Sequence, residues 1–283
     1  MRQLTPLAQH KFYQVDVFTD KPFLGNPVAA VFDADELTAP QMQQIAHWAN
    51  LSETIFFQKS ETADYRLRIF TPNNELPFAG HPTIGGGWAA VQAGLVNSQT
   101  FTMQCGAGIV MLQQKPGGVI MAEVPPPELS IKEVNPSLLQ DSFHNLKIAD
   151  PVVINAGPKW IVGRCENQQA LLALKTKRGP LVELSRQVGA VGATLYAIID
   201  EHNIEVRSFA PAEGIDEDPV CGSGNGSVAF HLHSYVPSAV KADYTAHQGQ
   251  CLGRAGQVLV ERSDGKISIG GNSVVTIDGT IDV

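Results

Sequence analysis

The sequence predicts an α+β protein of two similarly built halves, each with a β-sheet or barrel wrapped around a central helix. Residues 68–72 and 207–211 carry Arg, Phe and Pro at matching positions, 139 residues apart. Each run leads into a helix-like stretch, residues 83–93 and 223–235, with small or apolar residues on most faces. A helix of that composition is normally buried. The repeat therefore indicates an internal duplication of a helix-in-barrel unit.

Strand-like stretches flank both predicted helices. They cover residues 101–104, 108–112 and 119–124 in the first half, and residues 195–199, 204–209, 258–261 and 266–269 in the second. The proline-rich run at 124–127 is the strongest boundary signal between the halves. We predict a first domain at 1–124, completed by a C-terminal strand at 273–283, and a second domain at 125–272.

The first half opens with two predicted strands and a capped helix. Residues 12–18 alternate as in a strand, and residues 24–31 form a second strand after a turn. Thr38, with Gln41 three residues later, has the spacing of a capping box. We expect an amphipathic helix from there to about Asn50.

Composition excludes several classes of protein. The net charge of −8 and the absence of a basic run argue against a nucleic-acid partner, because phosphate binding needs clustered Lys and Arg. The four cysteines are scattered without metal-ligand spacing, which predicts reduced thiols and no metal site. No stretch has the length of a signal peptide or a membrane span. We expect a cytoplasmic protein that uses no cofactor and binds no membrane.

Four motifs resemble the phenazine-biosynthesis isomerase (PhzF-like) family, in the family's order: residues 24–29, 51–54, 78–83 and 217–223. The resemblance covers essentially the whole chain. It implies the fold of diaminopimelate epimerase, with two pseudo-symmetric halves and a site in the cleft between them. It also implies a cofactor-independent isomerase that shifts a proton on a small carboxylate-bearing substrate, and commonly a homodimer.

The resemblance also implies roles for particular residues. Glu53 is the expected catalytic residue, assisted by His81 and Asp218, with Ser223 near the substrate. Position 221 is more often Thr in the family, whereas Cys221 with the glycines after it is similar to the thiol motif of related epimerases and racemases.

The chemistry of these side chains fits the implied roles. A base that removes a proton from carbon needs a dry environment, and Glu53 lies among apolar neighbours at 51 and 55–57. The alternative is a carboxylate at a strand end on the surface. His81 suits a first helical turn that faces substrate, with a plain helix-start histidine as its alternative. Asp218 precedes the equivalent helix, so N-capping is the alternative for it.

Substrate binding is assigned to Asn26, in the first motif, and to the two helix starts. Backbone N–H groups around Gly80 and around Gly222 and Ser223 are free to bind a carboxylate if each helix begins there. We expect these residues to converge with the catalytic ones on one site.

Two further signals are weaker. Cys221 is a candidate thiolate base at a helix start, but the equivalent position in the first half is Ala79, so the thiol pair of a two-base racemase is absent. His231 and His233 are two apart on a predicted helix and point to nearly opposite sides, which argues against a metal site.

Two alternatives to the isomerase remain. One is a racemase or epimerase that uses Glu53 or Cys221, and the other is a small-molecule-binding protein without turnover.

Overall fold

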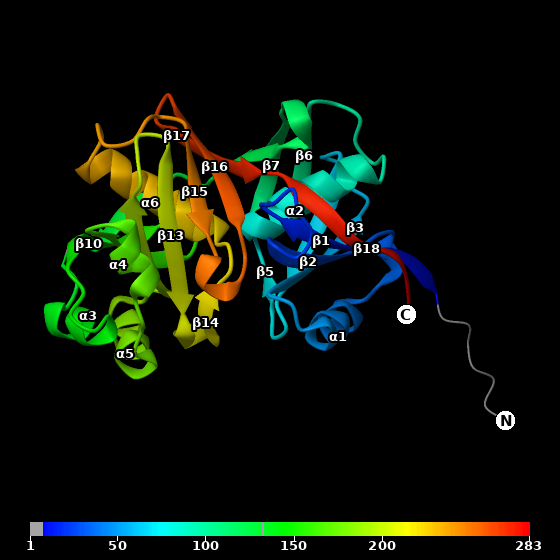
Figure 1. Ribbon diagram of the computed structural model, residues 1–283. Helices are drawn as coiled ribbons and strands as arrows, with labels where there is room; N and C mark the ends of the chain where they lie inside the picture. The colour runs from blue at the N-terminus through cyan, green and yellow to red at the C-terminus, as the bar shows by residue number, and fades with distance from the viewer. Residues whose placement is uncertain (1–7, 132) are drawn as a thin grey trace. The chain divides into compact units, whose positions relative to one another are not determined.

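The repeated runs lie on two strands, β4 (Tyr65–Phe70) and β13 (Asn203–Ala210), and each is followed by a long central helix (Figure 1). The computed structural model describes residues 8–131 and 133–283. The chain forms two compact units. The first comprises the described part of Met1–Phe23 with Pro27–Ile120 and Asn272–Val283, and the second comprises Leu24–Asn26 and Met121–Gly271. The predicted α+β fold of two similar halves is confirmed.

The first unit is a mixed sheet around helix α2 (Gly80–Gln92). Parallel pairs β2–β3 and β4–β6 are joined by the antiparallel pair β3–β4, and β18 pairs with β1. Its strands are β1 (Gln9–Val17), β2 (Asn26–Val31), β3 (Glu53–Gln58), β4, β5 (Glu75–Leu76), β6 (Thr100–Cys105), β7 (Gly108–Gln114) and β18 (Ser273–Asp282).

The second unit repeats this order around helix α6 (Gly222–Tyr235). Parallel pairs β11–β12 and β13–β15 are joined by the antiparallel pair β12–β13. Its strands are β8 (Ile120–Glu123), β9 (Glu128–Ile131), β10 (Ile148–Asn155), β11 (Lys159–Cys165), β12 (Gly192–Ile198), β13, β14 (Ile215–Asp218), β15 (Tyr244–Gln248), β16 (Gly256–Ser263) and β17 (Lys266–Gly271).

Strand register makes individual positions of the two units equivalent. In the first unit Val28 pairs with Glu53 at the start of β3, and in the second Trp160 pairs with Gly192 at the start of β12. In the next strand of each unit an arginine pairs with the residue three positions after this point: Arg68 of β4 pairs with Phe56, and Arg207 of β13 pairs with Leu195. The offset of 139 residues, which relates Arg68 to Arg207, thus also relates Glu53 to Gly192.

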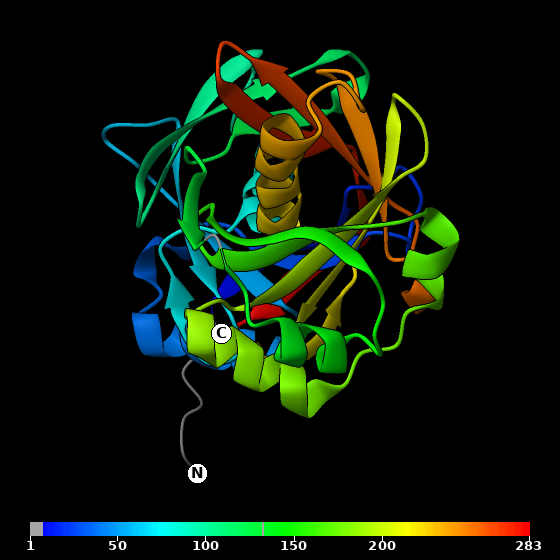
Figure 2. The same ribbon diagram turned by 90° about the vertical axis from the view of Figure 1, so that its left-hand side faces the viewer.

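Both central helices are buried, as their sequences predict. In α2 a Cβ added at Gly85, Gly86 or Gly87 would lie only 2.5–2.9 Å from Val17, Leu67 or Leu112, so only glycine lets the strands approach this closely. Helix α6 contacts β10, β11, β12, β16 and β17. Figure 2 shows it running through the middle of the second unit with strands on several sides.

The remaining helices lie outside these sheets. In α1 (Ala39–Ala49) the predicted capping box is present: Thr38 and Gln41 bond reciprocally, and Asn50 ends the helix in the left-handed conformation. The others are α3 (Pro136–Ser142), α4 (Gln168–Ala173) and α5 (Arg178–Val188), and apolar residues of all three pack into one core beside β12 and β13.

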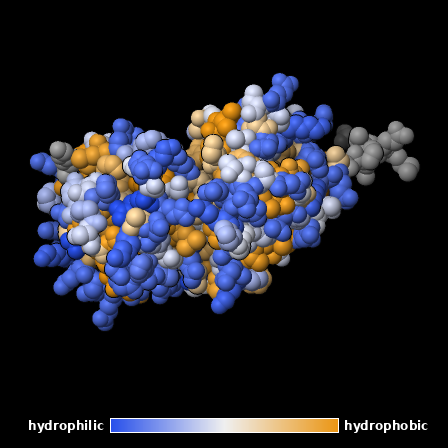
Figure 3. Space-filling model, turned by 90° about the horizontal axis from the view of Figure 1, so that it is seen from above, coloured by the Kyte–Doolittle hydropathy of each residue, from blue (hydrophilic) through white to orange (hydrophobic). Residues whose placement is uncertain are grey.

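One face of the molecule is mostly polar. Figure 3 shows hydrophilic side chains over most of the visible face of each unit, with smaller apolar patches between them. Among residues 8–131 and 133–283, no helix combines the length and apolar character needed to cross a membrane.

Candidate active site

Glu53 and His81 meet in the first unit. Glu53 is the first residue of β3, and His81 is the second residue of α2. His81 Nδ1 lies 3.0 Å from Glu53 Oε2, and only 5% of the His81 side chain and 17% of the Glu53 side chain are exposed. Thr54 and Ile55, which follow Glu53 in the strand, are fully buried. The carboxylate therefore stands at the edge of a dry core, beside a titratable ring.

The pair keeps unused hydrogen-bonding capacity. His81 Nε2 is buried and has no hydrogen-bond partner among the described residues. Glu53 Oε2 is also buried and, apart from its close approach to His81, lacks an aligned donor there. Buried polar atoms are rarely left without a partner. An unpartnered ring nitrogen next to a carboxylate is thus suited to a polar group of a bound ligand.

The start of α2 has no side-chain cap. Its N-cap residue is Ala79, which offers no side-chain cap, and Thr83 bonds back to the Ala79 carbonyl through both its N–H and its hydroxyl. The first N–H groups of a helix carry partial positive charge. The predicted anion-binding role of Gly80 therefore fits the local structure.

A second group of predicted residues meets in the second unit. Asp218, half-buried at the end of β14, accepts hydrogen bonds at Oδ1 from Asn26 Nδ2 (3.2 Å) and from the Val220 N–H (3.0 Å). Asn26 Nδ2 also donates to the Val220 carbonyl (3.0 Å), and Asn26 is 1% exposed. The amide nitrogen of Asn26 thus bonds the loop that follows Asp218. Its role in substrate binding stays a prediction.

Cys221, not Asp218, caps helix α6. The Cys221 Sγ accepts a hydrogen bond from the Gly224 N–H at 3.3 Å, and Cys221 is the N-cap residue. The N-cap interpretation of Asp218 is therefore wrong, because its carboxylate bonds Val220, two residues on and before the helix begins.

The Ser223 hydroxyl already has a protein partner. Trp160 Nε1–H donates to Ser223 Oγ at 3.0 Å, and Cys221 Sγ lies 3.6 Å from the same oxygen. Trp160 therefore fixes the oxygen as an acceptor, and the Ser223 proton is directed either to Cys221 Sγ or to a bound ligand. A substrate oxygen is a suitable acceptor for that proton, so the arrangement fits the predicted role of Ser223.

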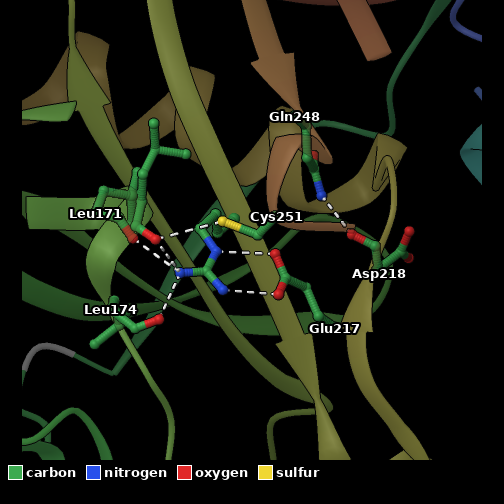
Figure 4. A network of polar contacts seen from close by, with 8 residues as sticks. Leu171, Leu174, Glu217, Asp218, Gln248 and Cys251 are labelled. Atoms are coloured by element: carbon green, nitrogen blue, oxygen red, sulfur yellow. Dashed lines mark hydrogen bonds and ion pairs between the residues drawn. The ribbon is translucent and has the colours of Figure 1, made fainter. Parts of the chain in front are cut away.

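Sequence reasoning missed three buried side chains in this region. They are Trp160, Asn225 and Gln248, which contact Ser223, Cys221 and Asp218 respectively. Figure 4 shows Gln248 reaching the backbone of Asp218. Asn225 lies among the glycines that follow Cys221, whereas Trp160 and Gln248 belong to none of the motifs quoted from the sequence.

The two histidines of α6 have separate surroundings. His231 is fully buried, with Nδ1 2.9 Å from the Tyr196 hydroxyl and Nε2 2.7 Å from the Asp150 carbonyl, whereas His233 is exposed. Within the described chain, no group of three or more His, Cys, Asp or Glu side chains is placed to hold a metal ion. The expectation of a metal-free site stays a prediction.

Glu53 and His81 are therefore brought together in one unit, and Asn26, Asp218, Cys221, Gly222 and Ser223 in the other. The predicted convergence of both groups on one cleft stays a prediction.

Comparison with known proteins identifies relatives along the whole chain. Residues 15–279 match the family described as phenazine biosynthesis-like protein. The trans-2,3-dihydro-3-hydroxyanthranilate isomerase of Pseudomonas chlororaphis is 33% identical, over 96% of this chain and 99% of the relative. A protein of Schizosaccharomyces pombe called antisense-enhancing sequence 1 is 38% identical over 96% of this chain and 99% of its own length.

Solved structures agree with these sequence relationships. The Bacillus anthracis phenazine biosynthesis protein of the PhzF family superposes with a TM-score of 0.87 at 25% identity, covering 98% of this chain and all of the other. The similarity in fold to this structure therefore covers both halves of the chain.

Proposed function

Since the chain belongs to the phenazine biosynthesis-like family, we propose that it is an isomerase that shifts a proton between two carbons of a small carboxylate-bearing substrate. Several relatives carry the name isomerase, including that of Pseudomonas chlororaphis. The observation that carries the proposal is the contact of Glu53 with His81 in a dry environment.

Glu53 acts as the base in this proposal. Its carboxylate accepts a proton from an activated carbon of the substrate. The electrons of the broken C–H bond form a new double bond to the adjacent carbon, and the electrons of the existing double bond move to the carbon that takes up the proton. The protonated Glu53 then returns the proton to another carbon of the same molecule, so the molecular formula is unchanged. A base within hydrogen-bond reach of its proton and shielded from water suits this chemistry.

His81 assists through both ring nitrogens. Nδ1 lies 3.0 Å from Glu53 Oε2 and is placed to stabilise the carboxylate or exchange a proton with it. Nε2, buried without a partner in the described chain, is the atom that bonds the substrate. The ring therefore connects the base to the reacting molecule.

Residues of the second unit hold the substrate. The Ser223 hydroxyl, fixed by Trp160, and the N–H groups at the start of α6 around Gly222 bind its carboxylate. Asp218 assists by orienting the substrate or relaying a proton. Cys221 serves as the helix cap, because Ala79 stands at the equivalent first-half position and supplies no second thiol.

The test follows a deuterium label. The purified protein is incubated in heavy water with trans-2,3-dihydro-3-hydroxyanthranilate and a panel of cyclic and amino-acid-like acids, and substrate mass is followed by mass spectrometry. Glu53→Gln is expected to keep the fold and ligand binding while turnover falls about 100- to 10,000-fold, because the amide cannot act as a base. Cys221→Ala is expected to retain activity within about tenfold and lose mainly the cap.

Opposite outcomes would assign the function differently. Exchange that survives Glu53→Gln but is lost in Cys221→Ala would move the chemistry to the thiol and favour a racemase. Binding without exchange in the wild type, across the panel, would favour the binding protein. Loss of turnover on chelation, restored by one metal ion, would refute a cofactor-free reaction.

A further inference from the structure

Residues 218–221 form a short loop between β14 and α6, and three buried carboxamides hold it. Asn26, Asn225 and Gln248 are at most 1% exposed. Each donates at least one hydrogen bond to the carboxylate of Asp218 or to a backbone carbonyl of the loop. This loop carries one predicted catalytic carboxylate and leads directly into the helix start that binds substrate in the proposed function.

Gln248 joins the two ends of the loop. Its Nε2 donates to the Asp218 carbonyl at 3.0 Å, and its Oε1 accepts from the Cys221 N–H at 3.2 Å. One carboxamide therefore spans the first and last residues of the loop. Only a side chain with both a donor and an acceptor makes these two bonds together.

Asn225 fixes which way the Gln248 amide points. Asn225 Nδ2 donates to Gln248 Oε1 at 2.9 Å and to the Cys221 carbonyl at 2.8 Å. The oxygen of Gln248 must therefore face α6, and its nitrogen must face Asp218. The Asn225 side chain leaves from the first turn of the helix, so loop, helix start and strand β15 form one connected network.

We propose that Gln248 is a positioning residue for the acid–base reaction, a role that rests on the proposed function. It touches no reacting atom. It holds the Asp218 backbone and the Cys221 N–H in one conformation, so that the Asp218 carboxylate and the N–H groups of α6 keep fixed directions before substrate arrives. Misplacing a catalytic group by about 1 Å costs on the order of 100-fold in rate.

The network is costly to leave incomplete. Replacing Gln248 by an apolar side chain leaves the Asp218 carbonyl and the Cys221 N–H without this partner. Buried groups that lose their hydrogen bond favour conformations in which water reaches them. The loop is therefore expected to open locally while the sheets stay folded.

The experiment combines thiol labelling with kinetics in Gln248→Met. Cys221 is 5% exposed and is bonded to Gln248 through its backbone, so its alkylation by N-ethylmaleimide reports loop opening. Cys251 is exposed and labels in every variant, whereas Cys165 is 1% exposed and reports unfolding of the second unit. Peptide mass spectrometry separates the cysteines.

Gln168→Met is the matched control. Gln168 Nε2 also donates to a buried partner of the same unit, Glu205 Oε2 at 3.0 Å, but bonds no atom of the loop. Gln248→Glu is the second variant in case Gln248→Met does not fold: one oxygen keeps the acceptor for Cys221 and Asn225, and the other replaces the donor to Asp218 with an acceptor that repels its carbonyl when the carboxylate is ionised, so the loop is again expected to open.

In Gln248→Met we expect labelling of Cys221 to accelerate at least about tenfold with Cys165 still protected. We also expect kcat for deuterium exchange to fall about 100-fold, more than KM changes. Gln168→Met is expected to leave both values near the wild type. Protection of Cys221 as in the wild type, equal effects in Gln168→Met, or a wild-type kcat despite an open loop would each overturn the proposal.

Failure of the proposed function gives a different result. If wild-type protein exchanges no proton on any acid of the panel, the proposed isomerase and the kinetic role of Gln248 are both refuted. The labelling then still decides whether Gln248 holds the loop.

Discussion

The two units place different residues at the same point of the same fold. Glu53 begins β3 opposite Val28, and Gly192 begins β12 opposite Trp160. A Cβ on Gly192 would lie 1.9 Å from the Phe209 carbonyl oxygen. The second unit therefore has no room for any side chain where the first carries its carboxylate.

The difference extends to both central helices. Counted from the N-cap, His81 of α2 corresponds to Ser223 of α6, and Ala79 corresponds to Cys221. The first unit thus carries a carboxylate and a histidine in contact, and the second carries a hydroxyl and a capping thiol at the start of its helix. In the proposed function, one half of the duplicated fold transfers the proton and the other half holds the substrate.

The sharpest test of this division compares the equivalent residues His81 and Ser223. His81→Asn is expected to lower kcat about 100-fold or more, because general acid–base assistance is worth about 100- to 10,000-fold. Ser223→Ala is expected to raise KM about 10- to 100-fold with a smaller change in kcat, since a hydrogen bond to a charged group is lost. Steady-state kinetics and circular dichroism check both. A larger kcat loss in Ser223→Ala would reverse the division.

A second comparison concerns two arginine–glutamate pairs built alike. Arg68 binds Glu75 through Nε and Nη2 at 2.7 Å each, and Arg207 binds Glu217 through the same atoms at 2.9 and 2.8 Å. Each guanidinium also lies over the phenylalanine two residues on, about 5 Å from its ring centre.

Burial separates these pairs. Arg207 and Glu217 are 7% and 11% exposed, against 17% and 42% for Arg68 and Glu75. Arg207 also donates to the carbonyls at the end of α4, those of Leu171 and Leu174 (Figure 4). Burial opposes its charge, but Glu217 outweighs this and raises the pKa of the guanidinium.

Removing each glutamate should therefore have unequal effects on stability. Glu217→Gln is expected to destabilise by about 3 kcal/mol, because it leaves a buried charge without its partner. Glu75→Gln should cost about 1 kcal/mol or less, as an exposed pair does. Urea unfolding at pH 7 measures both, with m-values checked for equality. Equal losses would show that burial does not distinguish the pairs.

The close packing at Gly192 gives a third test. Gly192→Ala is expected to destabilise by about 1–3 kcal/mol, since the Cβ overlaps the backbone of β13. A Cβ added at Gly179 in α5 would meet no atom within 4 Å, so Gly179→Ala should be neutral or stabilising by up to about 1 kcal/mol. Thermal unfolding compares the two. A tolerated Gly192→Ala would reopen the position for a side chain.

Much of the fold was predictable because its signals are local or repeated. The capping box of Thr38 and Gln41, the offset between Arg68 and Arg207, and the apolar central helices all depend on residues close in sequence or on an exact repeat. The contact of Glu53 with His81 joins two of the motifs quoted from the sequence.

Two of the three missed residues depend on distant contacts. Gln248 reaches Asp218 across 30 positions and Trp160 reaches Ser223 across 63, so both contacts require the register of strands that are far apart in sequence. The alternative of N-capping by Asp218 is wrong because its carboxylate bonds Val220 in the turn before the helix begins, and no residue pattern specified that turn.

The smallest expected effect concerns the pH dependence of stability, to which a buried histidine of the central helix α6 contributes. Ten residues after the N-cap, α2 has Ala89 and α6 has the fully buried His231. Because the Asp150 carbonyl can only accept, His231 Nε2 carries the proton and Nδ1 accepts from the Tyr196 hydroxyl. Burial lowers the pKa of His231 below 6.5, and Asp150 opposes the shift only in part.

The sign of the pH dependence follows from that shift. Below about pH 6.5 the histidine of the unfolded chain binds a proton, whereas the buried His231 of the folded chain resists protonation. The contribution of His231 to stability is therefore full above this pH. It is lost as the pH falls through the lowered pKa of the folded state. His231→Gln should lower stability at pH 7.5 yet remove up to about 1 kcal/mol of the further loss between pH 6.5 and 5. His233→Gln, exposed on the same helix, should keep the wild-type slope. Urea unfolding across this pH range measures all three proteins. An unchanged slope in His231→Gln would mean that other groups set the acid sensitivity.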